Sequence, residues 1–211
     1  MDTYKESITA GSTQLNAGDT MGALKVFQAV LEELGTKPTS EILQLIGICW
    51  RMLGDAELAT EAFSRAYTVA TNDIDKGRIM RDWSMVPLTQ GRYVDARKCL
   101  DESLRLLLES SVVEHAVTLG FVGRLEARLG NTWSAVTNFR RADMILKHEK
   151  TPPIYILNNL VHWMEVASLR ERVKLARRAI PLAIRHDNIK RLGQIVLLVA
   201  CRPLAIRLAR R

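Results

Sequence analysis

The side chains that most often carry chemistry are few in this chain and stand far apart. No histidine stands at metal-ligand spacing from another histidine or from a cysteine, and there is no CxxC pair. The sequence also lacks HExxH, GxSxG and a glycine-rich phosphate loop. These absences predict a protein that is not an enzyme and that holds no metal and no cofactor. The residues considered are His115, His148, His162, His186, Cys49, Cys99 and Cys201.

The cysteines and the chain ends bear on the compartment. Three widely spaced cysteines do not form a disulfide framework and are typical of free thiols under reducing conditions. The first residues are polar and lack the apolar core of a secretory signal. The longest strongly apolar run, at 195–201, is far shorter than the roughly 20 residues that span a bilayer. We therefore expect a cytoplasmic protein.

Positive charge is concentrated near the C-terminus. The formal charge is +7, yet residues 150–211 hold 13 Lys and Arg against 3 Asp and Glu, a local +10. Residues 1–149 hold 17 Lys and Arg against 20 Asp and Glu, a local −3. This asymmetry indicates either an acidic partner or anionic surface, or a solvated basic face. The candidate basic patch comprises Arg177, Arg178, Arg185, Lys190 and Arg191.

Four segments share one spacing of small, turn and apolar residues, which is the strongest signal in the sequence. A small residue is followed after seven positions by a turn glycine, then by an alanine five further on, a large residue four beyond it, and a small or apolar one after three more. Turn glycines at 18, 54, 91 and 130 are separated by 36, 37 and 39 residues. The copies are Gly11, Gly18, Ala23, Phe27, Val30; Gly47, Gly54, Ala59, Phe63, Ala66; Ser84, Gly91, Ala96, Leu100, Ser103; and Gly123, Gly130, Ala135, Phe139, Ala142.

This spacing describes two helices joined by a tight turn. Glycine can adopt the left-handed conformation that ends a helix, and Asp19, Asp55 or Asn131 after it can cap the next one. Steps of three, four and five residues keep the marked positions on one helical face. Small residues let the two helix axes approach closely, and the large residue fills the gap between neighbouring pairs.

The pattern resembles the tetratricopeptide repeat, most clearly at 46–67 and 122–144, although its pitch is two to five residues longer than the usual repeat. The resemblance implies an all-α, right-handed solenoid of antiparallel helix pairs whose first helices line a concave groove. We expect one domain over 1–211 with repeats near 3–36, 39–72, 74–110 and 112–148, a degenerate pair at 153–186 and basic capping helices at 188–211. Pro87 falls inside an expected helix at 74–89 and predicts a kink there.

The resemblance also places a binding groove on the first helices. Its lining looks basic and apolar, which favours an acidic or carboxylate-ended peptide, although these arginines could instead pair with neighbouring acids. Only Arg78 matches the carboxylate clamp of one familiar subclass, so that clamp is not expected. The predicted groove residues are Lys5, Gln44, Ile48, Arg51, Met52, Arg78, Arg81, Met85, Arg124 and Arg128.

Two functions follow from these features. The first is a scaffold that binds a protein or peptide segment in the groove. The alternative is a module that docks on nucleic acid or an anionic membrane through its basic C-terminal helices, although the absence of aromatic residues there disfavours stacking on single strands. Self-association through the apolar stripe at 189–199 is a third possibility.

Overall fold

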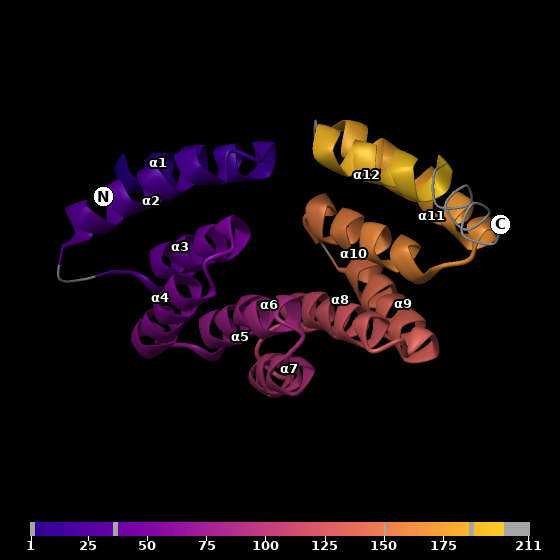
Figure 1. Cartoon of the computed structure of the whole chain (residues 1–211), viewed down its shortest axis with the longest axis horizontal. Coiled ribbons are helices and arrows are strands. Elements are labelled where there is room, and N and C mark those ends of the chain that lie inside the picture. The colour runs from indigo at the N-terminus through magenta and orange to yellow at the C-terminus, as the bar shows by residue number, and fades with distance from the viewer. Residues whose placement is uncertain (1–2, 36–37, 150, 186–187, 201–211) are drawn as a thin grey trace. The chain divides into compact units, whose positions relative to one another are not determined.

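The computed structural model describes residues 3–35, 38–149, 151–185 and 188–200, and over these residues it contains helices and no strand (Figure 1). The predicted all-α fold class is confirmed, and the helix boundaries follow the turn glycines closely. The helices are α1 (Thr3–Ala17), α2 (Thr20–Leu34), α3 (Ser40–Leu53), α4 (Ala56–Val69), α5 (Asp73–Trp83), α6 (Met85–Thr89), α7 (Tyr93–Leu107), α8 (Val112–Arg128), α9 (Thr132–His148), α10 (Pro153–Val166), α11 (Leu169–Arg185) and α12 (Ile189–Ala200).

The turns between paired helices show the predicted chemistry. Gly54 ends α3 with a φ of 91°, a left-handed conformation that a side chain would strain. Asp55 then caps α4, because its carboxylate accepts the backbone N–H of Leu58 at 2.9 Å. Asp19 caps α2 in the same way through Gly22, also at 2.9 Å. Asn131 instead donates its side-chain amide to Glu126 at 2.8 Å and does not cap α9.

The small residues of the first helices meet the large residues of the second helices. A Cβ built on Gly47 would stand 3.0 Å from the ring of Phe63, and one on Gly123 would stand 2.9 Å from Phe139. A side chain at either position would force the aromatic ring to shift, so glycine favours this close approach. In the third repeat a close approach occurs at Gly77, where a Cβ would lie 2.5 Å from Leu107.

The third repeat departs from the others because its first helix is interrupted. Pro87 has no N–H with which to continue the hydrogen-bond ladder, and the helix is divided at Ser84 into α5 and α6. The helix is thus interrupted close to Pro87, and the predicted kink itself stays a prediction. Pro181, in contrast, lies within α11 without ending it.

The helices form two compact units, 1–115 (unit 1) and 116–211 (unit 2). In unit 1, α1 packs on α2, α3 on α4, and α5 on α7, around a core that includes Phe27 and Phe63. In unit 2, α10 packs on both α9 and α11, and α11 packs on α12, around a core that includes Phe139 and Trp163. The single domain predicted over 1–211 stays a prediction.

Replacing Ala135 with leucine should lower the free energy of unfolding by about 1–3 kcal/mol. Ala135 is fully buried against the core of unit 2, so the added carbons have no free space. Urea denaturation would measure the effect. The exposed Ala29→Leu is the matched control and should change stability by less than about 0.5 kcal/mol. Equal effects in the two variants would contradict the helix packing described here.

Candidate functional site

Within unit 1, α3 and α5 form a face on which several predicted groove residues meet. Gln44, Ile48, Arg51 and Met52 follow one another on α3 at steps of four, three and one residue, so they share one side of that helix. The side-chain amide of Gln44 donates to Asp82 on α5 at 2.7 Å. This bond joins the two helices. We call the surface formed by these α3 residues together with Arg78 and Asp82 of α5 the α3–α5 face.

A buried ion-pair network lies next to this face. Arg81 donates from Nη1 to Glu114 Oε2 at 2.5 Å and from Nε to Asp82 Oδ1 at 3.3 Å. Arg78 pairs with the other oxygen of Glu114 at 2.6 Å. Burial alone would raise the pKa of Glu114, but Arg81 and Arg78 hold it below its ordinary value. Glu114 is therefore a carboxylate that neutralises two arginines at neutral pH.

Two residues predicted to line the groove are buried in the structure. Arg81 is only 7% exposed and Met85 only 5%, so neither offers a partner more than a small area. Arg81 is buried because Glu114 and Asp82 together compensate its charge. Glu114 was not predicted from the sequence, since it lies 33 residues after Arg81 at the start of α8. For Arg78 and Arg81 the alternative of pairing with neighbouring acids is the one that the structure shows.

Arg51 is the least compensated cation on the α3–α5 face. Its Nε atom is buried and has no hydrogen-bond partner among the described residues. Burial lowers the pKa of Arg51, and the nearby carboxylate of Asp82 opposes this only in part. Asp82 already accepts hydrogen bonds from Gln44 and Arg81. Arg51 is thus a partly desolvated guanidinium without a carboxylate of its own.

The surroundings of Arg51 are partly apolar. Met52 is 38% exposed, while Ile48 packs partly against the core. Lys5, on α1, is exposed. The α3–α5 face therefore combines one under-compensated cation with accessible apolar side chains.

The last two predicted groove residues belong to unit 2. Arg124 lies over the ring of Phe121, with its guanidinium carbon 5.4 Å from the ring centroid. Arg124 and the exposed Arg128 both lower the pKa of Glu165, against burial, which raises it. Glu165 also contacts His162, whose Nδ1 lies 3.1 Å from its Oε1. Both arginines thus lie near the carboxylate of Glu165.

Unit 2 should lose stability as the pH falls from about 6.5 to about 4, and His162 should be one cause. Burial lowers the pKa of His162 from 6.5 to about 4, although Glu165 opposes the shift. The unfolded chain therefore binds the proton first, which favours unfolding by up to about 3 kcal/mol at the acid end. Urea unfolding of wild type and His162→Gln at several pH values would test this. A pH dependence that is unchanged in His162→Gln would contradict it.

The predicted basic C-terminal patch is divided by intramolecular contacts. Arg178 donates to both oxygens of Asp143, at 2.7 and 3.1 Å, and Arg191 donates to Gln194 at 2.7 Å. Arg177 and Arg185 are exposed, and the side chain of Lys190 lies outside the described residues. Asp143 therefore neutralises Arg178, whereas the bond to Gln194 holds Arg191 without compensating its charge.

The degenerate fifth pair uses arginine where the other repeats have the packing alanine. Arg172 is 7% exposed and donates from Nε to the backbone oxygen of Met164 at 3.0 Å. Its Nη1 reaches the backbone oxygen of Leu198 at 3.4 Å. The side chain therefore connects α10, α11 and α12.

The candidates for chemistry remain scattered in the fold. Across the described ranges, no three His, Cys, Asp or Glu side chains gather in a group that could hold a metal ion. Burial raises the pKa of Cys49 to about 11, so its thiol is protonated at neutral pH. In the same residues, no helix combines the length and apolar character needed to cross a membrane.

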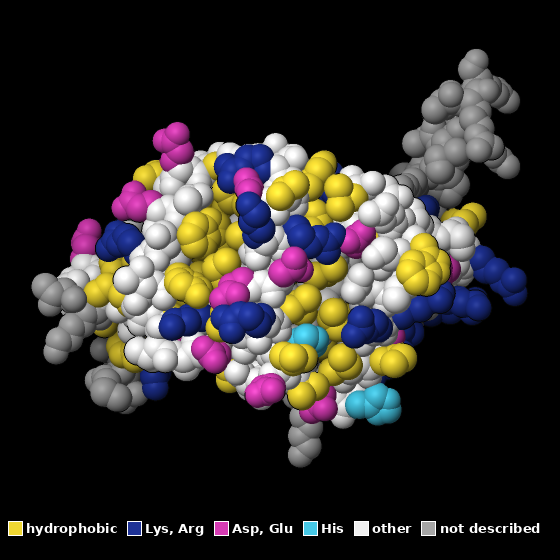
Figure 2. Space-filling view, turned by 90° about the horizontal axis from the view of Figure 1, so that it is seen from below, with side chains coloured by type: hydrophobic (Ala, Val, Ile, Leu, Met, Phe, Trp, Pro, Cys, Tyr) yellow, Lys and Arg dark blue, Asp and Glu magenta, His cyan; other side chains and the backbone are white. Residues whose placement is uncertain are grey.

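One face of the molecule shows how the surface charges are distributed. In Figure 2, lysine and arginine side chains are interspersed with aspartate and glutamate, and apolar side chains lie among them.

Trp133, near the start of α9, is 82% exposed.

Comparison with known proteins supports the repeat architecture. No protein-family model and no curated protein sequence matches the chain. Among solved structures, a putative kinesin light chain of Podosopora anserina, described as having nearly identical TPR-like repeats, is 9% identical over 94% of this chain and 96% of that one, with a TM-score of 0.56. PilF of Pseudomonas aeruginosa is 14% identical over 93% and 90%, with a TM-score of 0.57.

A third structure belongs to a protein complex. The APC/C hetero-tetramer Cut9–Hcn1 matches at 11% identity over 99% of this chain and 42% of that chain, with a TM-score of 0.61. At these identities the likeness concerns the fold. Together with the glycine and alanine contacts described above, it shows that the chain has the tetratricopeptide-like helical-repeat fold.

Proposed function

We propose that this protein is an interaction scaffold that binds a segment of another protein on the α3–α5 face, with a carboxylate of that segment paired with Arg51. The observation that carries the proposal is that Arg51 is a half-buried guanidinium without a carboxylate of its own, and that its buried Nε has no hydrogen-bond partner among the described residues. A partly desolvated cation without a counter-charge costs free energy, and a ligand carboxylate at the accessible end of the guanidinium reduces that cost.

The chemistry of Arg51 suits this role. A guanidinium presents its donors in a planar fork that matches a carboxylate, and it is more weakly hydrated than an ammonium group. Ile48 and Met52 flank Arg51 on the same side of α3 and can contact an apolar side chain of the same segment. The ligand class is therefore an acidic residue next to an apolar one, or the C-terminus of a chain after an apolar residue.

The fold supports binding as the activity. Cut9–Hcn1, one of the structures with a similar fold, is a complex of two proteins. Docking on nucleic acid or an anionic membrane through the predicted basic patch is the weaker proposal, because Asp143 neutralises Arg178 of that patch.

Selection from a displayed library of random peptides tests the proposed function. The whole chain and its Arg51→Gln variant are each used as bait, and Arg65→Gln serves as control because Arg65 is exposed on α4. We expect wild type and Arg65→Gln to enrich peptides that carry an acidic residue or an acidic C-terminus beside an apolar residue. Arg51→Gln should not enrich them. Enrichment of the same peptides by Arg51→Gln would contradict the proposal.

A further inference from the structure

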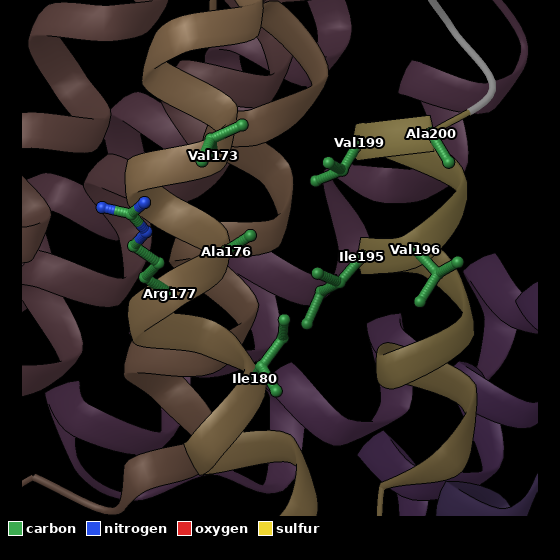
Figure 3. A pocket seen from close by; sticks show the side chains of 8 residues that line it. All are labelled: Val173, Ala176, Arg177, Ile180, Ile195, Val196, Val199 and Ala200. Carbon is green, nitrogen blue, oxygen red and sulfur yellow. The ribbon is translucent and has the colours of Figure 1, made fainter.

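Unit 2 contains a second surface, separate from the α3–α5 face, between α11 and α12. A cavity of about 300 Å³ opens there, roughly ten times the volume of a water molecule in the liquid. Figure 3 shows Val173, Ala176 and Ile180 of α11 facing Ile195 and Val199 of α12 across this space. Of the residues that line it, only Arg177 is charged, and its guanidinium points away from α12. We call this space the α11–α12 slot.

One side of α12 is apolar and exposed to solvent. Gly193, Val196, Leu197 and Ala200 lie on one side of α12, and Val196 and Leu197 are 53% and 59% exposed. A Cβ built on Gly193 would meet nothing within 4 Å. In contrast, Gly47 is covered by the ring of Phe63 from the helix that follows it. Val196 and Leu197 therefore present an accessible apolar area on α12.

A row of free basic side chains runs beside the slot. Arg170, Lys174 and Arg177 follow one another on α11 at steps of four and three residues, so they lie on one side of that helix. All three are exposed, and none forms an ion pair with another described residue. Two different residues of this helix do form ion pairs: Glu171 pairs with Arg140, and Arg178 pairs with Asp143. The apolar slot is therefore bordered by uncompensated positive charge.

Charge decides between the occupants of the slot. A second copy of this chain would bring the same three cations toward themselves if it docked by the same surface. Residues 201–211 carry four arginines and no acid, so they are also poorly matched to this border. An acidic partner is matched in both respects, because its apolar side fills the slot while its carboxylates face the row.

We infer that the α11–α12 slot binds an amphipathic helix of a different protein that has acidic residues along one edge of its apolar side. The helix packs along the apolar side of α12. A large apolar or aromatic side chain lies over Gly193, as Phe63 does over Gly47, and acidic side chains pair with Arg170, Lys174 and Arg177.

Two synthetic helical peptides test this inference against the whole chain. Both carry leucine and phenylalanine at helical spacing; one has glutamate along the edge of the apolar side and the other has lysine in its place. Fluorescence anisotropy should show the glutamate peptide binding about tenfold more tightly at low salt, because a few exposed pairs each contribute modestly. The preference should reverse in the double variant Lys174→Glu with Arg177→Glu. It should persist in Lys25→Glu with Arg141→Glu, which makes the same charge change at exposed sites elsewhere.

Two further variants distinguish the occupants. Val196→Asp should abolish binding of the glutamate peptide. Deleting residues 201–211 should leave the affinity for that peptide within about twofold of the wild-type value. Binding that is absent, or equal for the two peptides, overturns the inference. A rise of tenfold or more in the affinity for the glutamate peptide on deletion would identify residues 201–211 as the occupant. A dimer in sedimentation that Val196→Asp dissociates would identify a second copy of the chain as the occupant. Either result also overturns the inference. Arg51→Gln should not affect this binding, so the proposal for the slot and the proposal for the α3–α5 face are tested independently.

Discussion

Replacing Glu114 with glutamine should lower the free energy of unfolding by about 3–5 kcal/mol. Glu114 is 2% exposed and accepts from Arg81 at 2.5 Å and from Arg78 at 2.6 Å. Glutamine keeps the shape but removes the charge, so the buried Arg81 loses the nearer of the two carboxylates that neutralise it. Urea denaturation at neutral pH measures the loss.

The control and the pH dependence sharpen this prediction. Glu102→Gln removes a carboxylate that pairs with Arg105 at 2.7 Å on the surface, and it should cost less than about 1 kcal/mol. Because the pKa of Glu114 is lowered in the folded state, its contribution is present above its unfolded pKa and is lost as the pH falls through the folded one. Equal losses for the two variants at neutral pH would contradict the role assigned to Glu114.

Replacing Phe63 with alanine should cost about 3–5 kcal/mol, also measured by urea denaturation. The Phe63 ring is fully buried, fills the space over Gly47, and stacks on Trp83 with centroids 6.5 Å apart. Its removal leaves a cavity at the contact between α3, α4 and α5, which packed helices close only in part. Val94→Ala, at a largely exposed apolar residue, should change stability by less than about 0.5 kcal/mol.

A double-mutant cycle shows whether the ring lies where the repeat places it. Gly47→Ala gains up to about 1 kcal/mol of helix propensity but brings a Cβ to 3.0 Å from the Phe63 ring. The same substitution should therefore be more favourable in the Phe63→Ala background than in wild type. Additive effects would show that the two residues do not touch.

The sequence predicted most of the helices because their ends have local causes. A glycine that can adopt a positive φ and an aspartate that caps the next helix are both visible within a few residues, as at Gly54 and Asp55. The alanine of the repeat was also placed correctly: Ala59 and Ala135 are fully buried, as the close approach of paired helices requires. Short-range patterns of this kind depend on spacing alone.

The candidate site was harder to predict because its charges are balanced over long stretches of sequence. Arg81 was expected to face a ligand, but Glu114 compensates it from 33 residues away. Arg178 was expected in a free basic patch, but Asp143 binds it from 35 residues away. Spacing on one helix shows which side a residue occupies and gives no information on the partner that a later helix supplies. Arg51 stands out only once those partners are assigned.

The affinity of one selected peptide for wild type, Arg51→Gln and Arg65→Gln tests the central claim most directly. The peptide is one that wild type enriches, and isothermal titration calorimetry at neutral pH gives the dissociation constants. Loss of a desolvated arginine–carboxylate pair costs about 2 kcal/mol or more, so Arg51→Gln should weaken binding by at least about thirtyfold. Arg65→Gln should bind within about twofold of wild type. Equal affinities for all three proteins would show that Arg51 is not where the partner binds.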